Sequence, residues 1–231
     1  MGVSNKIPLF DALSSKQRAS LEKRLVSRAY HENELILDFE DQSSDVLFIV
    51  SGKVRILFRF ATGREVIIAD LAEGEFFGEL SAIDGKGRSA NVTALQKTEI
   101  AILSATDFLE ITTSVPEIAE IILKTLVSRI RALDMRFSEM SVLKTNERLY
   151  VELLRLSVPR RMIPKGGKSD QRIISPPPFH HHLAARIGCR REVVSRELSS
   201  MMKQGILEKS RGGLVILEVA RLEERIAEAL N

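Results

Sequence analysis

The stretch that decides the fold of this chain of 231 residues is GEFFGELSAIDGKGRSANVTA, residues 74–94. It contains four glycines, two early acids, Glu75 and Glu79, and one arginine, Arg88. Arg88 is followed by Ser89 and Ala90, small residues that leave the backbone open to close approach. A segment of this kind is suited to holding a ligand, and the residues around it indicate which ligand.

Short apolar runs lead up to this stretch. The segment ELILDFEDQSSDVLFIVSGKVRILFRFATGREVIIADLAEGEFFGE, residues 34–79, is broken at EDQSSD, SGK, ATGRE and AEGE. Strands of about five residues with turns this frequent predict an antiparallel barrel or roll. ATGRE predicts a hairpin in which Gly63 takes a positive φ. Before these strands, SKQRASLEKRLVSRAY, residues 15–30, predicts a short helix.

Composition excludes several classes of protein. Hydrophobic residues make up 44% of the chain and charged residues 28%, as in a soluble globular protein. No apolar run approaches the roughly 18 residues that a membrane-spanning helix needs. The single cysteine, Cys189, excludes an internal disulfide and a four-cysteine zinc or iron–sulfur site, and it favours a reducing cytoplasm. No catalytic triad or metal-ligand spacing stands out, so we expect no enzymatic activity.

Charge is distributed unevenly along the chain. The net charge is only +3, yet residues 147–214 contain 14 Lys and Arg against 6 Asp and Glu, a balance of +8. The rest of the chain must therefore carry −5. A basic C-terminal part joined to an acidic remainder predicts one module that meets a polyanion and another that does not.

One long helix is predicted between these two parts. After Pro116, the chain continues to about Leu143 without glycine or proline. Its apolar residues are spaced alternately by three and four, which is the seam of a coiled coil. This spacing favours a homodimer, and the alternative is a helix packed on its own domain. The seam residues are Leu123, Leu126, Ile130, Leu133, Phe137 and Met140.

A helix–turn–helix pattern follows in FHHHLAARIGCRREVVSRELSSMMKQ, residues 179–204, where Gly188 allows a sharp turn between two short helices. The second helix carries Arg190, Arg191 and Glu192 at its start and Arg196 one turn later. Arginine can bind guanine through two hydrogen bonds, and a carboxylate can accept from cytosine. These side chains predict DNA binding, and GILEKSRGGLVILEV, residues 205–219, predicts a two-stranded wing. The alternative is an αα-hairpin with a solvated charged face.

Three adjacent histidines, His180, His181 and His182, begin the first of these helices. Neighbouring residues of a helix point about 100° apart, so three in a row cannot converge on one metal ion. We therefore expect contact with phosphate or plain exposure for them, and no metal.

A roll, a long helix and a winged helix–turn–helix in this order resemble the CRP/FNR family of bacterial transcription regulators. The resemblance extends over about residues 8–218, and the motifs GEFFGELS…GRSA and IGCRREVVSREL carry it. It implies an α+β fold. A cyclic-nucleotide-binding, jelly-roll-like β-roll would occupy residues 1–116, a dimerisation helix with its hinge residues 117–144, and a winged helix–turn–helix DNA-binding domain residues 145–231.

The resemblance also implies a function. A cyclic nucleotide, cAMP or cGMP, would bind in the roll and set the DNA-binding domains of a homodimer. The dimer would bind palindromic DNA with TGTGA-like half-sites, since Arg191, Glu192 and Arg196 match the family's recognition helix. RNA polymerase is a further implied partner. A family regulator with another effector or none is the alternative, and a regulatory subunit that uses the roll alone is a rival from another class.

The opening stretch supplies the implied nucleotide contacts. Arg88 would neutralise the phosphate, Ser89 would add a donor, and Glu79 would accept a hydrogen bond from the ribose 2′-hydroxyl. Gly78 would let the backbone approach the sugar. The positions that match the family are Gly78, Glu79, Leu80, Ser81, Arg88, Ser89 and Ala90.

The base is harder to assign. The family reads it with two polar residues of the long helix, and Leu133 and Asp134 occupy those positions here. Leucine offers no hydrogen bond, and a carboxylate only accepts. Asp134 would take the N6 amino group of adenine, or N1–H and N2–H₂ of guanine together. Two parallel hydrogen bonds favour guanine, so cGMP is an alternative to cAMP. The alternative is a solvated Asp134 paired with Arg131 or Arg136.

The chain departs from the family pattern in other places. Glu40 stands where the family usually has glycine in the first hairpin. The cysteine cluster of the oxygen-sensing relatives is missing from the N-terminal region, and His31 is the only histidine before His180. We therefore expect neither an iron–sulfur cluster nor haem.

Overall fold

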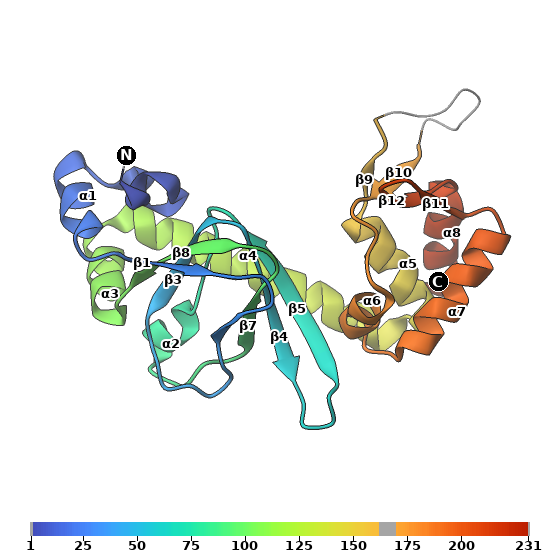
Figure 1. Cartoon of the computed structure of the whole chain (residues 1–231), viewed down its shortest axis with the longest axis horizontal. Helices are drawn as coiled ribbons and strands as arrows, with labels where there is room; N and C mark the ends of the chain where they lie inside the picture. The colour runs from blue at the N-terminus through green and yellow to red at the C-terminus, as the bar shows by residue number, and fades with distance from the viewer. Residues whose placement is uncertain (1, 162–169, 231) are drawn as a thin grey trace. The chain divides into compact units, whose positions relative to one another are not determined.

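The computed structural model describes residues 2–161 and 170–230. The chain divides into two compact units, Met1–Ile130 and Arg131–Asn231 (Figure 1). The division falls within one long helix, α4, Pro116–Val142, so each unit includes a part of it.

The first unit is built on two antiparallel sheets of four strands, with the orders β1-β8-β3-β6 and β2-β7-β4-β5. One apolar cluster contains residues of both sheets, among them Tyr30, Ile49, Val54 and Val92, so the two sheets enclose a common core. This confirms the predicted antiparallel roll. The strands are β1 Val26–Tyr30, β2 Leu35–Leu37, β3 Val46–Ser51, β4 Lys53–Arg59, β5 Glu65–Ala72, β6 Phe76–Phe77, β7 Asn91–Ala94 and β8 Thr98–Leu103.

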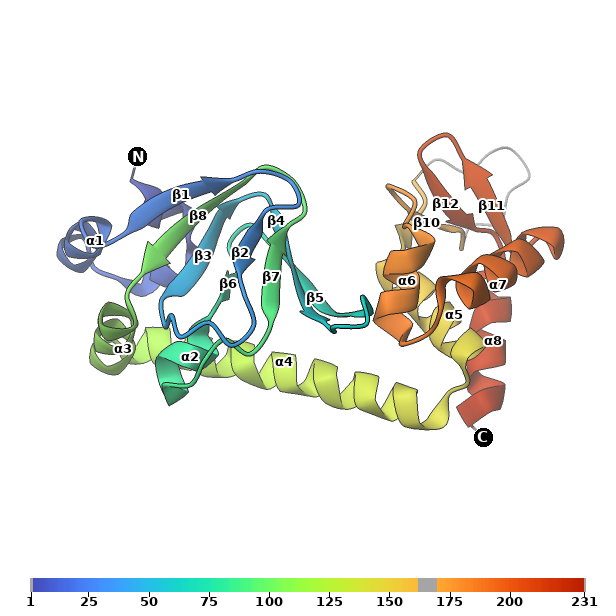
Figure 2. The ribbon, with the colours of Figure 1, turned by 60° about the horizontal axis from the view of Figure 1, so that its bottom comes forward.

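Helices close this unit at one end of the roll. Figure 2 shows α2, Glu79–Asp84, α3, Ala105–Ser114, and the start of α4 beside the strands. A second apolar cluster joins Phe48 of β3 to Phe108 of α3 and to Ile118 and Ile122 of α4. The roll and the first turns of α4 therefore form one folded body.

Two local predictions for this unit can be compared with the structure. The helix expected over residues 15–30 is too long: α1, Ser15–Glu22, ends early, and residues 26–30 form β1. These residues pair with β8, and sheet pairing outweighs their helical pattern. The predicted hairpin is confirmed, since β4 and β5 pair and Gly63 has a φ of 75°.

The predicted seam of α4 is largely exposed within this chain. The exposed fraction is 62% for Leu123, 57% for Ile130 and 76% for Phe137, and Leu133 and Met140 are exposed as well. Leu126 differs, because it is half-buried against the core of the roll. Val127 is exposed instead and continues the apolar stripe.

The second unit contains a small sheet with the strand order β11-β12-β10-β9. Buried side chains from its helices, including Leu153, Leu183, Val194 and Leu222, form its core. Its elements are α5 Thr145–Leu156, β9 Val158–Pro159, β10 Arg172–Ile174, α6 His180–Ile187, α7 Arg191–Lys203, β11 Leu207–Ser210, β12 Gly213–Ile216 and α8 Val219–Leu230.

The predicted helix–turn–helix and wing are both present. Helices α6 and α7 are joined through Gly188, whose φ of 70° is the left-handed conformation expected of it. Strands β11 and β12 pair as the wing. Helix α8 was not predicted, although Val219 and Leu222 are buried and Ile226 packs against the same core. Residues 162–169 belong to the sequence PRRMIPKGGKSDQRIISPPP, residues 159–178, which predicts an exposed loop with one short strand inside the DNA-binding module, and they lie outside the described residues.

Candidate functional site

The centre of the first candidate site is the buried guanidinium of Arg88, which is 2% exposed. Its Nε donates to Ser43 Oγ over 2.9 Å, its Nη1 to the carbonyl of Gly78 over 3.0 Å, and its Nη2 to the carbonyl of Asp45 over 2.9 Å. Burial lowers the pKa of Arg88, and the nearby carboxylates, Asp45 first, act in the opposite direction. The protein therefore holds a single cation in a fixed orientation.

The backbone of Arg88 is held by the turn that was uncertain in the sequence. The amide of Arg88 donates to the carbonyl of Asp41 over 2.9 Å, and the amide of Glu40 donates to the carbonyl of Arg88 over 3.0 Å. Glu40 has a φ of 66°, a conformation that glycine adopts without strain. The turn thus has the backbone that a glycine would favour, although a glutamate occupies it.

Gly78 is needed at this site for a reason that the sequence did not indicate. Its φ is 84°, and a Cβ placed on it would lie 2.7 Å from Nη1 of Arg88 and 2.8 Å from the carbonyl oxygen of Asp45. Any side chain at this position would collide with the guanidinium. Gly78 therefore makes room for Arg88 before any ligand is considered.

Glu79, also buried at 4% exposure, is paired with a residue that sequence analysis missed. Nη1 of Arg129 on α4 donates to Glu79 Oε1 over 2.8 Å, and Nη2 donates to the carbonyl of Phe76 over 2.6 Å. The sequence did contain a signal for Arg129. Arg129 follows Ile122 and Leu126 at helical spacing, and a charged residue on the core-facing side of α4 indicates a buried partner.

The other predicted residues of this site differ in exposure. Ser81 is buried and donates to the carbonyl of Gly87 over 3.3 Å, and Ala90 is buried as well. Ser89 and Leu80 are exposed. The structure brings Gly78, Glu79 and Ser81 into the same unit as Arg88. Leu133 and Asp134 are exposed residues of α4 that belong to the second unit.

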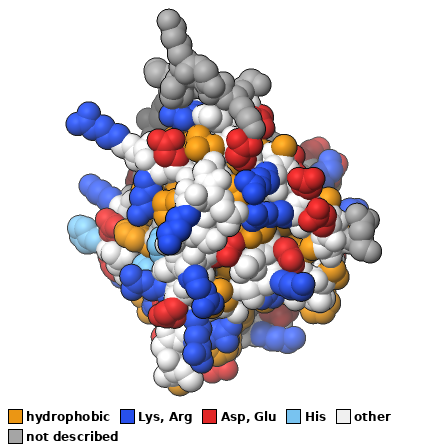
Figure 3. Space-filling model, turned by 90° about the vertical axis from the view of Figure 1, so that its right-hand side faces the viewer, with side chains coloured by type: hydrophobic (Ala, Val, Ile, Leu, Met, Phe, Trp, Pro, Cys, Tyr) orange, Lys and Arg blue, Asp and Glu red, His pale blue; other side chains and the backbone are white. Residues whose placement is uncertain are grey.

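The second candidate site lies on α7. Arg191, Glu192 and Arg196 are exposed on this helix, and Arg190 is exposed immediately before it. The opposite face of α7 is buried through Val194, Leu198 and Met201. Figure 3 shows Asp and Glu side chains among the Lys and Arg side chains on the visible face of the molecule. The exposed side chains at the start of α7 thus include both hydrogen-bond donors, the three arginines, and an acceptor, Glu192.

Comparison with known proteins finds a matching family model for each of the two parts of the chain. The family model of the cyclic nucleotide-binding domain matches residues 27–114, and that of the Crp-like helix-turn-helix domain matches residues 147–225. The chain is 30% identical over 217 residues to the cyclic AMP receptor protein of Thermus thermophilus, covering 94% of this chain and 95% of the relative. The chain belongs to the CRP/FNR family of transcription regulators.

A second relative and a solved structure are also similar to this chain. The cAMP-activated global transcriptional regulator Vfr of Pseudomonas aeruginosa is 29% identical over 194 residues, 82% of this chain and 88% of Vfr. A CooA mutant structure from Carboxydothermus hydrogenoformans has the same fold, with a TM-score of 0.76, 20% identity, and coverage of 94% and 95% of the two chains. The helix–turn–helix match also argues against a regulatory subunit that uses the roll alone. None of the described helices combines the length and hydrophobicity of a membrane span.

The three histidines of this CRP/FNR protein make different contacts. Nδ1 of His180 lies 2.7 Å from Oγ of Ser195 on α7. Burial lowers the pKa of His180, and the charges of Lys209 and Arg191 lower it further, which favours the neutral ring. The rings of His181 and His182 contact each other and Phe179 instead. In the described residues, no group of three potential metal ligands is found.

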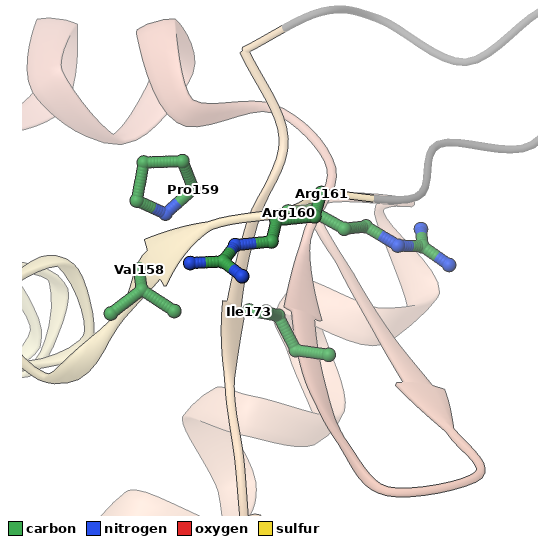
Figure 4. Close-up of a pocket in the computed structure, with 5 residues that line it drawn as sticks. All are labelled: Val158, Pro159, Arg160, Arg161 and Ile173. Atoms are coloured by element: carbon green, nitrogen blue, oxygen red, sulfur yellow. The ribbon is translucent and has the colours of Figure 1, made fainter.

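A surface pocket of about 690 Å³ lies in the second unit, outside both candidate sites. It is lined by Val158, Pro159, Arg160, Arg161 and Ile173. Figure 4 shows the Arg160 and Arg161 side chains extending in opposite directions. The two side chains do not converge on a single anion, so we assign no ligand to this pocket.

Proposed function

We propose that this protein is a homodimeric transcription regulator that binds cAMP in its roll and palindromic DNA through its two α7 helices. The observation that supports the effector most strongly is the buried Arg88. Three of its five N–H donors have partners in the described part of the chain, so two remain for an anion. The Thermus relative and Vfr are both named for cAMP.

The phosphate of the nucleotide would bind at Arg88 and Ser89. A guanidinium can make two parallel charge-assisted hydrogen bonds to a phosphate, and its planar fork fixes the orientation of that group. Ser89 is exposed and directly follows Arg88, so its hydroxyl is available as a further donor. The single charge of a cyclic phosphodiester matches this one buried cation.

The ribose would bind at Glu79, whose carboxylate accepts a hydrogen bond from the 2′-hydroxyl. Arg129 supports this role, because it pairs with one carboxylate oxygen of Glu79, Oε1, and leaves the other oxygen for the sugar. The analogue 2′-deoxy-cAMP lacks this donor. Since a hydrogen bond to a charged group contributes about 1.5–3 kcal/mol, the analogue should bind about 10–100-fold more weakly.

The base would be read by Asp134 of α4, with Leu133 as an apolar neighbour. Asp134 accepts hydrogen bonds only, which suits the N6 amino group of adenine. Guanine, with N1–H and N2–H₂ together, is the competing base, so cGMP is the alternative effector. The proposed domains are the roll over residues 1–116, the dimerisation helix and its hinge over 117–144, and the DNA-binding domain over 145–231.

The dimer would form through the exposed stripe of α4. Leu123, Ile130 and Phe137 are each more than half exposed, and such a stripe at coiled-coil spacing is stabilised by a second copy of the same helix. Nucleotide binding would change how the two helices pair and move the DNA-binding domains about residues 144–146. The ligand shifts this equilibrium only by the difference between its affinities for the two states.

The DNA-binding domains would then enter successive major grooves one helical turn apart. Arg191, Glu192 and Arg196 would contact base edges and favour TGTGA-like half-sites, and Arg190 would contact the backbone or a flanking base. Such a regulator would act in the cytoplasm and contact RNA polymerase.

Isothermal titration calorimetry with cAMP, 2′-deoxy-cAMP and cGMP tests the effector. The wild type should bind cAMP more tightly than 2′-deoxy-cAMP, and Asp134→Ala should lose the discrimination between cAMP and cGMP while it still binds both nucleotides. DNA selected from a random library should contain the palindrome, and cAMP should tighten its binding. If neither nucleotide binds at millimolar concentration and DNA binds equally without them, the protein is a regulator with another effector or none.

A further inference from the structure

The recognition helix α7 is held by a cluster of polar side chains from two other helices of the second unit, Tyr150 of α5 and Arg225 of α8. The hydroxyl of Tyr150 on α5 donates to Oε1 of Glu197 on α7 over 2.5 Å. Nη1 of Arg225 on α8 donates to the same hydroxyl over 3.3 Å, and its Nη2 donates to Oε1 of Gln204 over 2.8 Å. Arg225 thus contacts the middle of α7 through Tyr150 and its C-terminal end through Gln204.

Tyr150 is the buried member of this cluster. It is 5% exposed, and the guanidinium of Arg225 lies 5.7 Å from the centre of its ring. Burial, followed by the hydrogen bond to the Glu197 carboxylate, raises the pKa of Tyr150 to about 12. The hydroxyl therefore keeps its proton near neutral pH and donates it to Glu197.

The directional contact adds what apolar packing cannot supply. Val194, Leu198 and Met201 bury one face of α7, but the hydrophobic effect has no preferred direction, whereas a hydrogen bond has one. Side chains of a helix reach about 5–6 Å from its axis, so a rotation of about 20° would move them by about 2 Å. A shift of that size would take Arg191 and Arg196 out of hydrogen-bonding distance of a base.

We propose that Tyr150, supported by Arg225 of α8, is a positioning residue that sets the rotation of α7 and thereby the base preference of the protein. This inference rests on the proposed function, in which α7 contacts base edges. It also gives α8 a role, because the helix that follows the wing becomes part of the support of the recognition helix.

The experiment compares wild type and Tyr150→Phe as full-length proteins at saturating cAMP. Dissociation constants are measured by fluorescence anisotropy for the DNA site selected with the wild type, for that site with one half-site base pair changed, and for an unrelated duplex. Discrimination is the ratio of the dissociation constants for the changed site and the selected site. In the variant this ratio should be about 5–10-fold lower, which is a part of what one well-placed arginine–guanine contact provides. Binding to the unrelated duplex should stay within about twofold, because phosphate contacts carry it.

Matched variants separate positioning from folding. Tyr30→Phe removes the hydroxyl of the other tyrosine of this chain, which is buried in the roll, and should leave discrimination unchanged. Glu197→Gln keeps an oxygen that can accept from Tyr150 and should keep most of the discrimination, whereas Glu197→Leu should lose it. A merely structural role for Tyr150 would weaken binding to all three duplexes by the same factor.

Equal discrimination by Tyr150→Phe and the wild type would overturn the inference and leave the proposed function intact. An equal loss of affinity for all three duplexes would overturn it too, because the role would then be structural. A wild type that shows no base preference would overturn the proposed function, and the inference with it.

Discussion

The two candidate sites use the same residue types in opposite environments. In the roll, Arg88 and Glu79 are almost fully buried, and each already has partners within the protein. On α7, Arg191 and Glu192 are exposed. A buried charge without partners is costly, so the effector site must be assembled before a ligand arrives. The exposed charged side chains of α7 are hydrated in the absence of DNA and need no partner within the protein. Substitution of the buried Arg88 or Glu79 should therefore reduce both stability and ligand binding, and substitution of the exposed charged residues of α7 should reduce only DNA binding.

Arg88→Ala should have the largest effect. It removes a buried guanidinium and leaves the carbonyls of Gly78 and Asp45 without this donor, which should lower the free energy of unfolding by about 3–5 kcal/mol. It should also weaken cAMP binding about 100-fold or more, because the phosphate loses a charge-assisted pair. Urea unfolding followed by circular dichroism, and calorimetry, measure the two effects. An unchanged free energy of unfolding would contradict the expectation that the buried charges of the roll, unlike the exposed charges of α7, contribute to stability.

Gly78→Ala should be the next most damaging change, and Gly85→Ala is its matched control. Both glycines have left-handed φ angles, 84° and 69°, but a Cβ on Gly85 would have no heavy atom within 4 Å. The control should lose only about 1 kcal/mol, the usual cost of that conformation for alanine. Gly78→Ala should lose about 2–4 kcal/mol, because its Cβ also displaces Arg88. Equal losses in urea unfolding would show that Arg88 adapts without cost.

Arg191→Ala should show the opposite behaviour to Arg88→Ala. Its side chain is exposed, so the free energy of unfolding should change by less than about 0.5 kcal/mol. Binding to a TGTGA palindrome should weaken by about 1–3 kcal/mol with relaxed preference at one base pair. Electrophoretic mobility shifts on the palindrome and on single-base variants measure this. An unchanged preference would remove Arg191 from the base contacts.

Glu40→Gly should have the smallest effect, and its sign is stabilising. Glu40 has a φ of 66° in the turn that holds the backbone of Arg88. Glycine relieves a conformational cost of about 1–2 kcal/mol, but its freedom in the unfolded chain costs about 0.5–1 kcal/mol. The net gain should be about 0.5 kcal/mol, seen as a higher urea midpoint with unchanged cAMP binding. A lower midpoint would mean that the glutamate side chain stabilises this turn.

Local patterns in the sequence were sufficient to predict the main elements. Alternating apolar runs indicated the strands, three–four spacing indicated α4, and Gly63 and Gly188 marked turns whose φ angles the structure confirms. These features depend on residues close together in the chain, where backbone geometry and side-chain period act directly. The resemblance to the CRP/FNR family, also read from short motifs, is confirmed by the comparisons. The residues assigned to the nucleotide and to DNA stay predictions.

The sequence alone thus determined the order of the main parts, which are the roll, the long helix and the winged helix–turn–helix, together with the family and a set of candidate residues. Only the tertiary structure decided how those residues are held. Arg129 contacts Glu79 across 50 residues of chain, Ser43 contacts Arg88 across 45, and Tyr150 contacts Glu197 across 47. The physical reason is that a directional hydrogen bond between distant residues depends on where packing places whole helices and strands. No local period along the chain encodes such a placement.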